Sequence, residues 1–268
     1  MNPLARTAYY CCAVRALDAE RRQPICGDQL AQRFMDEEAL AFVAPLLRFS
    51  EPAVCNAARH RMIDDLLRER LAADPKHLVV LLGAGLDTRA FRLHGGKWVE
   101  IDNPEIMAVK EAALPATQSP NHLQRVPIDF QHERLADVLK PWQGRRKATV
   151  VMEGVICYLS GEQLRDSLRA LRASLPAHRL ICDLQTRMFA DALGGRLRRE
   201  LASFGAHFGE LSVRPWRDIE SAGYRQHSRQ SIVERASLHG ALWAPPFLLD
   251  TVFRFIRDGY TVCEFEAV

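Results

Sequence analysis

Lysine is scarce in this chain of 268 residues: only five of its 36 basic residues are lysine, and the other 31 are arginine. The 33 acidic residues leave a net charge of +3, which excludes a strongly basic nucleic-acid binder and an acidic tail protein. The chain has no internal repeat or flexible linker. Its 48% hydrophobic content excludes disordered and collagen-like classes.

No CxxC pair occurs among the seven cysteines, so neither a disulfide framework nor a zinc site is predicted, and we expect no metal. The apolar run at residues 8–14 is too short for the core of a signal peptide, and no run reaches the length of a membrane span. Free thiols favour a reducing compartment. We therefore expect a cytoplasmic protein that binds neither nucleic acid nor membrane.

The middle of the chain alternates short apolar runs with helical patterns. The expected strands lie at 77–82, 97–102, 124–128, 148–152 and 179–184. The first of them is almost continuously apolar, as in a strand buried on both faces. The clearest helix is expected at 160–175, where Ser160 and Gln163 form a candidate capping box. This alternation predicts an α/β fold with a doubly wound parallel sheet.

The two ends of the chain differ from this middle. Helical spacing is found at 28–43 and 52–71, and Asp74-Pro75 ends the second helix. The last third is expected to hold an Arg-rich helix at 185–208, a helix at 217–222 capped by Gly223, a strand from Tyr224 and a strand at 260–265. Asp258-Gly259 fits either a hairpin turn or a helix cap.

We expect one domain over residues 1–268. Its parts are a helical N-terminal extension (1–75), a cofactor-binding core (76–184), a lid or substrate region (185–245) and a C-terminal strand region (246–268).

A glycine-rich turn follows the first expected strand. Gly83 and Gly85 form a GxG pair, which lets the backbone approach a ligand at the carboxyl edge of the sheet. The sixth position of a full GxGxxG fingerprint is Thr88, and the missing glycine weakens the case for a dinucleotide. A GxG pair alone is common, so the residues around it decide its meaning.

Acidic residues follow the next strands. Asp102 can accept both hydroxyls of a ribose, and Glu100 lies on the same strand face and could share the role. Asp129 can accept the exocyclic amine of adenine with Phe130 covering the ring, and Glu153 can pair with a cationic amine. A carboxylate-lined cleft suits S-adenosylmethionine, which carries a sulfonium and an ammonium, and would repel a diphosphate.

Two arginines lie on the helix expected before the first strand. Arg59 or Arg61 could hold the carboxylate of such a cofactor bidentately. On helix spacing alone, a surface pair with Asp64 or Asp65 is the favoured interpretation.

These motifs form one ordered set. It consists of Arg59-x-Arg61-x-Ile63-Asp64, Gly83-Ala-Gly85-Leu-Asp87-Thr88-Arg89, Glu100-Ile-Asp102-x-Pro104-Glu105, Asp129-Phe130, and Glu153-Gly154-x-x-x-Tyr158-Leu159. The set resembles the leucine carboxyl methyltransferase family, over about residues 5–175 and again at 259–265. The resemblance implies a Rossmann-like class I methyltransferase fold with a seven-stranded, mostly parallel sheet, a helical lid insertion, and S-adenosylmethionine as the cofactor.

The resemblance also implies roles by motif position. Arg59 would bind the methionine carboxylate, Gly83 and Gly85 would face the methionine moiety, Asp102 would bind the ribose, Asp129 and Phe130 would contact adenine, Glu153 would face the amine, and Tyr158 would lie near the acceptor. His60 departs from the family pattern, because similar sequences often carry threonine there.

The expected reaction is O-methylation of a carboxylate or hydroxyl on a small-molecule or carrier-bound acceptor, in bacterial secondary metabolism. A carboxylate needs no base, whereas a phenol or alcohol usually does. His60, His207 and His227 are each expected to be ordinary surface or helix residues, so no catalytic residue is assigned. The alternatives are an NAD(P)-dependent oxidoreductase and a non-catalytic S-adenosylmethionine-binding protein.

Residues 185–235 hold nine arginines against six acidic residues, which accounts for the whole net charge. A solvated helical face is the favoured interpretation of this Arg-rich segment. The alternative is a basic lid that attracts an anionic acceptor.

Overall fold

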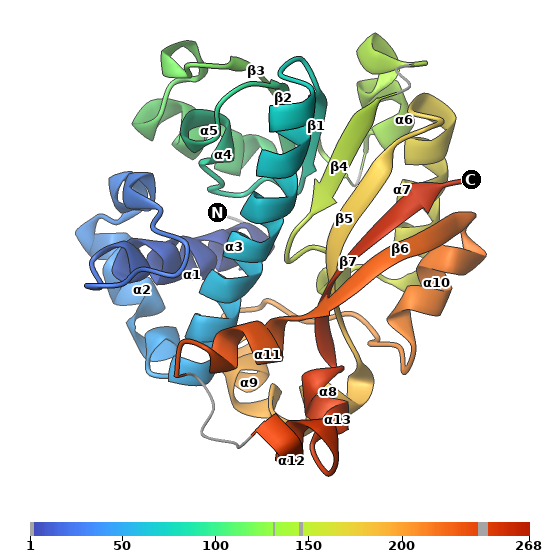
Figure 1. Ribbon diagram of the computed structural model, residues 1–268. Helices are drawn as coiled ribbons and strands as arrows, with labels where there is room; N and C mark the ends of the chain where they lie inside the picture. Colours follow the sequence, from blue (N-terminus) through green and yellow to red (C-terminus); the bar gives the residue numbers. More distant parts are fainter. Residues whose placement is uncertain (1–2, 131, 145–146, 241–245) are drawn as a thin grey trace.

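A seven-stranded sheet runs through the computed structural model, which describes residues 3–130, 132–144, 147–240 and 246–268 (Figure 1). In spatial order the strands are β3 (His122–Pro127), β2 (Lys97–Asp102), β1 (Leu78–Leu82), β4 (Ala148–Met152), β5 (Arg179–Gln185), β7 (Tyr260–Ala267) and β6 (Tyr224–Ser231). Strands β1 to β5 are parallel, and β7 is antiparallel to both of its neighbours. The expected doubly wound, mostly parallel sheet is confirmed.

Helices cover both faces of this sheet (Figure 1). The α-helices are α1 (Pro3–Ala19), α2 (Glu37–Leu47), α3 (Ser50–Ala73), α4 (Arg89–Arg92), α5 (Pro104–Ala113), α6 (Leu135–Val138), α7 (Gly161–Ser174), α8 (Arg187–Ala192), α9 (Gly195–Ser203), α10 (Pro215–Ser221), α11 (Ile232–Ser237), α12 (Pro246–Asp250) and α13 (Arg254–Arg257). Short 3₁₀ helices are η1 (Gln29–Phe34), η2 (Ala116–Gln118), η3 (Lys140–Trp142) and η4 (Ile156–Tyr158). No helix in the described ranges is long and apolar enough to cross a membrane.

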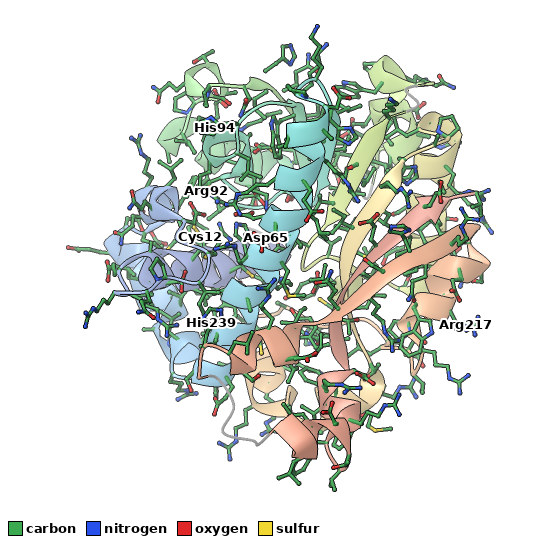
Figure 2. All side chains as sticks on the ribbon, in the orientation of Figure 1. Cys12, Asp65, Arg92, His94, Arg217 and His239 are labelled. Atoms are coloured by element: carbon green, nitrogen blue, oxygen red, sulfur yellow. The ribbon has the colours of Figure 1, made fainter. Side chains whose placement is uncertain are left out.

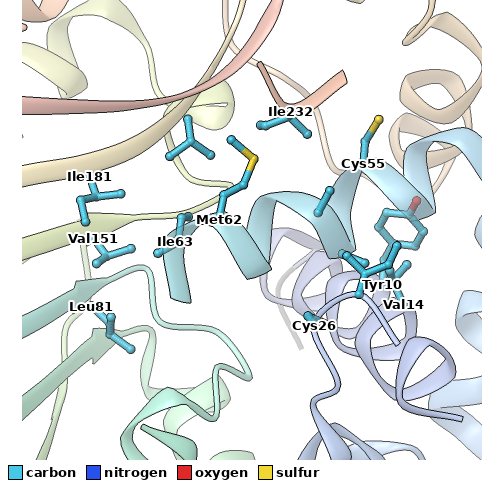
Figure 3. Packing of buried hydrophobic residues seen from close by; sticks show 14 of the residues in the cluster. Tyr10, Val14, Cys26, Cys55, Met62, Ile63, Leu81, Val151, Ile181 and Ile232 are labelled. Atoms are coloured by element: carbon cyan, nitrogen blue, oxygen red, sulfur yellow. The ribbon is translucent and has the colours of Figure 1, made fainter. Parts of the chain in front are cut away.

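The central strand β1 is buried on both faces because its alternate side chains enter two hydrophobic cores. Leu81 belongs to the core that α1 and α3 supply, where Met62 and Ile63 of α3 lie over the sheet (Figure 3). Val80 belongs to the opposite core, which includes Leu168 of α7. The first expected strand is therefore confirmed, and side chains of α1 and α3 belong to the core on one of its faces.

Local signals set the ends of the helices that frame the site. Helix α3 has Pro52 in its first turn and ends at Ala73, ahead of Pro75, as expected. Helix α7 begins with the expected capping box, in which Ser160 and Gln163 each bond the other's backbone.

The last third differs from expectation at two places. Residues 185–208 do not form one helix: α8 and α9 are separate elements, and the chain turns between them at Gly194. Asp258 caps the end of α13, so the helix-cap alternative is right and the hairpin turn is wrong. Residues 241–245, the end of the expected lid, lie outside the described part. Arg217 is part of α10, on the side of the molecule opposite α1 and α2 (Figure 2).

Candidate functional site

A cavity of about 1210 Å³ lies at the carboxyl ends of β1, β2, β4 and β5. Helices α1, α3, α8 and α9 supply further walls. All eight residues proposed from the sequence line it: Arg59, Gly83, Gly85, Asp102, Asp129, Phe130, Glu153 and Tyr158. Parallel strands place their carboxyl ends at one edge of the sheet, and this is why residues so far apart in sequence meet here.

The glycine-rich turn is a close-packed wall of the cavity. Gly83 and Gly85 have φ angles of +71° and +48°, in the left-handed region that favours glycine. A Cβ on Gly83 would lie 2.4 Å from a methyl group of Val155. The turn is pinned to β2, because the Gly85 N–H donates to Asp102 Oδ2 over 2.6 Å.

Asp102 presents a partly satisfied carboxylate to the cavity. Its second oxygen, Oδ1, accepts the N–H of Asn103, also over 2.6 Å. Burial raises the pKa of Asp102 above its ordinary value, although these two bonds act in the opposite direction. A carboxylate has about four lone-pair positions, so about one on each oxygen is left for a ligand's hydroxyls.

Glu100 does not share this role, and that expectation is wrong. Its carboxylate is fully buried and pairs with Lys110 Nζ and Arg125 Nε, each at 2.9 Å. Glu100 and Asp102 lie on one strand face, but helix α5 covers the earlier position with Lys110. Glu100 is therefore not among the residues that line the cavity.

Asp129 and Phe130 follow β3 at the outer end of the cavity. Asp129 is partly exposed and binds His132 Nδ1 at 2.7 Å. Phe130 is 53% exposed, which leaves an aromatic face free of protein packing beside the cavity. The pair offers a carboxylate and a flat apolar surface side by side, the combination that adenine recognition requires.

Arg59 is held in the interior rather than in a surface pair. Its Nε donates to Glu153 Oε1 at 3.0 Å, and its Nη1 donates to Asp183 Oδ2 at 3.1 Å and to Tyr260 Oη at 2.7 Å. Among the described residues, Nη2 meets only the Cys11 sulfur, at 3.8 Å. One face of the guanidinium is thus locked, and Nη2 is left for an anion in the cavity. The surface pair instead involves Arg61.

Glu153 is the meeting point of three cationic or polar groups. Arg59, Arg89 and His60 lie 3.0, 2.7 and 3.2 Å from its oxygens. Burial alone would raise the pKa of Glu153, but these neighbours hold it well below its ordinary value, so it is a carboxylate. Oε1 accepts from Arg59 Nε at 3.0 Å and lies 3.4 Å from His60 Nδ1, whose shorter contact is with Oε2, so Oε1 can still accept a further donor.

Arg89 organises a buried ion network behind the cavity. Its side chain is fully buried and contacts Asp64 at 2.6 Å, Asp87 at 2.5 Å and Glu153 at 2.7 Å. His60, Asp87 and Glu153 offer ligand atoms close enough for a metal ion. The Arg89 guanidinium contacts all three residues, so a protein cation already balances their charge.

His60 belongs to this network, so its expected place as an ordinary surface or helix residue is wrong. It is 1% exposed, with Nε2 2.7 Å from Arg92 Nη2 and Nδ1 3.2 Å from Glu153. Nδ1 also lies 2.8 Å from Arg89 Nη2, so an arginine N–H donor faces each ring nitrogen, and both contacts disfavour a protonated imidazolium. Burial and Arg89 lower the pKa of His60, which keeps the ring neutral. His207 and His227 are exposed, as expected.

The network also explains Thr88, which occupies the position of a third glycine. Thr88 is fully buried and donates its hydroxyl to Asp28 over 2.7 Å. Asp28 also pairs with Arg15 at 2.9 Å and Arg92 at 3.2 Å. Burial would raise the pKa of Asp28, but the two arginines bring it down to about 2. The hydrogen bond from Thr88 to Asp28, together with the ion pairs of Asp28, takes the place of the tight packing that a third glycine would provide.

Sequence reasoning missed several residues of this site. Asp183 accepts the Gly154 N–H at 2.6 Å and, like Tyr260, holds Arg59. A charged residue inside the apolar run 179–184 was the available signal. Tyr10 and Cys11 of α1 and a set of residues on α9 also line the cavity, and no motif marked them.

Tyr158 is the last residue of η4, which follows β4. Its ring packs edge-on against Phe208, with centroids 5.0 Å apart, and both residues line the cavity. Burial raises the pKa of Tyr158 well above its ordinary value, so its hydroxyl stays protonated.

A match to a protein-family model shows which family the chain belongs to. The model of the leucine carboxyl methyltransferase family matches residues 8–172, more than half of the chain. The chain belongs to this family. The match contains every candidate residue, from Arg59 to Tyr158, and the resemblance drawn from the motifs is confirmed.

Two curated relatives from actinobacteria are named as S-adenosyl-L-methionine-dependent methyltransferases. The one from Parafrankia is 33% identical over 66% of this chain and 62% of its own length, and the one from Frankia alni is 29% identical over 70% and 71%. The match thus spans about three fifths of the first of these. The expected cofactor is confirmed at the level of the family.

A solved structure supports the fold independently. A DUF574 family protein from Streptomyces avermitilis has a TM-score of 0.59 with 13% identity, and the match covers 96% of this chain and 97% of that one. At 13% identity, this similarity supports the fold and nothing further.

Proposed function

We propose that this chain transfers the methyl group of S-adenosylmethionine to an oxygen atom of a small molecule or a carrier-bound group. The observation that carries the proposal is the donor set around the glycine turn: carboxylates at the ends of neighbouring strands and one arginine whose Nη2 faces the cavity. Sulfonium and ammonium groups are attracted to such carboxylates, and a carboxylate is attracted to Arg59.

The residues fit this cofactor without rearrangement of the turn. In this proposal Arg59 Nη2 binds the cofactor's carboxylate, Glu153 Oε1 accepts from its ammonium, and Asp102 accepts from its ribose hydroxyls. Asp129 and Phe130 hold the adenine. A side chain on Gly83 or Gly85 would meet Val155 or Ala8 of the cavity wall, so glycine lets the turn pack closely beside the place proposed for the methionine moiety.

S-adenosylmethionine supplies a methyl group already activated by the sulfonium, so the protein's task is to position the attacking oxygen and exclude water. The cavity of about 1210 Å³ exceeds the roughly 300–1,000 Å³ usual for one ligand, which leaves room for the acceptor beside Tyr158.

A carboxylate acceptor fits this site better than a hydroxyl. No histidine of the described residues lines the cavity, and both ring nitrogens of His60 are occupied within the ion network. Tyr158 stays protonated. An acceptor that is already ionised needs no base, and this favours carboxyl methylation.

The setting that we propose is the cytoplasm of a bacterium, in secondary metabolism. All seven cysteines are free thiols, as a reducing compartment favours, and the named relatives are bacterial.

Mass spectrometry of the purified chain tests the proposal directly. We expect retained S-adenosylmethionine or S-adenosylhomocysteine, and methyl transfer in a screen of carboxylates and phenols. Retained NAD would overturn the assignment in favour of an oxidoreductase. Tight binding of S-adenosylmethionine without turnover on any acceptor would favour a binding protein.

A further inference from the structure

Helix α9 forms a wall of the cavity, and its arginines have no role in the proposed contacts with the cofactor. Arg196, Arg198 and Arg199 of this helix all line the cavity. Arg198 pairs with Asp191 at 3.3 Å. Arg196 and Arg199 are exposed, and no carboxylate of the described residues lies within 4.0 Å of either guanidinium. This wall therefore presents to the cavity two positive charges that no carboxylate of the described residues balances.

Helix stability does not explain these arginines. Arg196 lies in the first turn of α9, the positive end of the helix dipole, and that turn contains no acidic residue. A cation at this end is unfavourable for the helix, whereas an anion bound beside it would offset the cost. Arg196 is thus better explained by an anion bound in the cavity than by the stability of the helix.

The arginine wall lies close to the place assigned to the acceptor. The Arg198 guanidinium lies 5.6 Å from the centroid of the Phe208 ring, and that ring is in edge contact with Tyr158. One aromatic ring, that of Phe208, therefore separates the Arg198 guanidinium from Tyr158, and Arg196 and Arg199 lie on the same helix. A molecule of modest size can contact Arg196 or Arg199 while its reacting oxygen lies beside Tyr158.

We propose that Arg196 and Arg199 bind an anionic group of the acceptor that is distinct from the oxygen that is methylated. The inference rests on the proposed function. Arginine forks occupy the lone pairs of the anion they bind, so an oxygen held by them would be a poor nucleophile. The acceptor class is then a molecule with an apolar body, a reacting oxygen and a second, anionic group.

The charge distribution of the cavity orients such a molecule. Asp102 and Glu153 stand at the strand ends, where a cationic cofactor is held, and would repel an anion. Arg196 and Arg199 attract it to the wall that α9 forms. The anionic group serves as a handle that turns the reacting oxygen toward the strand ends, and this alignment is what methyl transfer needs.

Two matched probes test the handle without knowledge of the acceptor. One is 8-anilinonaphthalene-1-sulfonate, and the other is N-phenyl-1-naphthylamine, which has the same aromatic body without the sulfonate. Fluorescence titration would measure both on the full chain, with and without saturating S-adenosylhomocysteine. The variant is Arg196→Gln/Arg199→Gln. Its control is Arg217→Gln/Arg225→Gln, which removes two exposed arginines that do not line the cavity.

We expect the sulfonate to lose about tenfold or more in affinity in Arg196→Gln/Arg199→Gln, because charge-assisted bonds are lost. The neutral probe and the control variant should be unchanged, and salt should weaken sulfonate binding to the wild type. Equal behaviour of the two probes, or equal loss in the control, would overturn the proposal. Calorimetry with S-adenosylhomocysteine on the same samples tests the proposed function separately. A protein that binds S-adenosylhomocysteine but does not prefer the sulfonate probe would refute the anion site and leave the proposed function intact.

Discussion

Replacing Asp102 by Asn is the sharpest test of the cofactor site. The carboxylate already accepts one backbone N–H on each oxygen, from Gly85 and from Asn103, both at 2.6 Å. Of its roughly four lone-pair positions, about two remain, one on each oxygen. Two neighbouring acceptors match the two adjacent hydroxyls of a ribose.

The size of the effect follows from this count. Asn keeps one acceptor oxygen, loses the charge, and turns an NH₂ group toward a backbone N–H that also donates. A hydrogen bond to a charged group contributes about 1.5–3 kcal/mol. Loss of one such bond and weakening of the other amounts to about 2–4 kcal/mol, so affinity for S-adenosylhomocysteine should fall about 30- to 1,000-fold. Asp102→Ala, which removes both oxygens, should abolish binding.

Isothermal titration calorimetry is the assay, with Asp137→Asn as the control because that exposed residue pairs with Lys140 and does not line the cavity. Thermal denaturation of each variant separates loss of binding from loss of fold. Asp102→Asn that is folded and binds S-adenosylhomocysteine as tightly as the wild type would refute the ribose assignment.

Three further predictions concern the frame of the site. Gly83→Ala places a Cβ 2.4 Å from a methyl group of Val155, at positive φ, so it should lower the free energy of unfolding by about 1–3 kcal/mol in denaturant titration. The control Gly144→Ala, at φ +78° with no atom within 4 Å, should lower it less. Equal losses in the two variants would contradict the packing argument. Arg89→Met should lose about 3–5 kcal/mol in the same assay, because it leaves buried carboxylates unpaired. The control Arg169→Met breaks only a surface pair with Asp166 and should lose under about 1 kcal/mol. Burial lowers the pKa of His60, so below about pH 6.5 the unfolded chain binds a proton that the folded ring refuses, and stability falls as pH drops. The melting temperature of His60→Asn should fall less than that of the wild type between pH 7 and pH 5.5, and parallel curves would exclude this role.

Much of the site was predictable because its chemistry is concentrated at the ends of strands. An apolar run followed by glycines or by an acidic residue is a local pattern, and Gly83, Asp102 and Glu153 all follow it. Glu100 shows the limit of that logic. Strand alternation identifies its face, but the burial of that face by Lys110 depends on how α5 packs.

The residues that were missed are set by contacts between distant elements. Arg59 on α3 meets Asp183 on β5 and Tyr260 on β7, 124 and 201 residues away along the chain. His60 looked like any helix histidine until α3 was placed against Arg89 and Arg92. No spacing rule links such positions, because nothing local constrains them.

By itself, the sequence determined the strands of the sheet, the glycine turn and the carboxylates of the cofactor edge, since these depend on periodicity, backbone freedom and residue type over a few positions. The tertiary structure decided which charges face a ligand and which are balanced inside the protein. The 31 arginines illustrate this difference. Arg59 and Arg89 are buried against carboxylates, whereas Arg196 and Arg199 line the cavity without one, because only packing brings distant charges within a few ångströms.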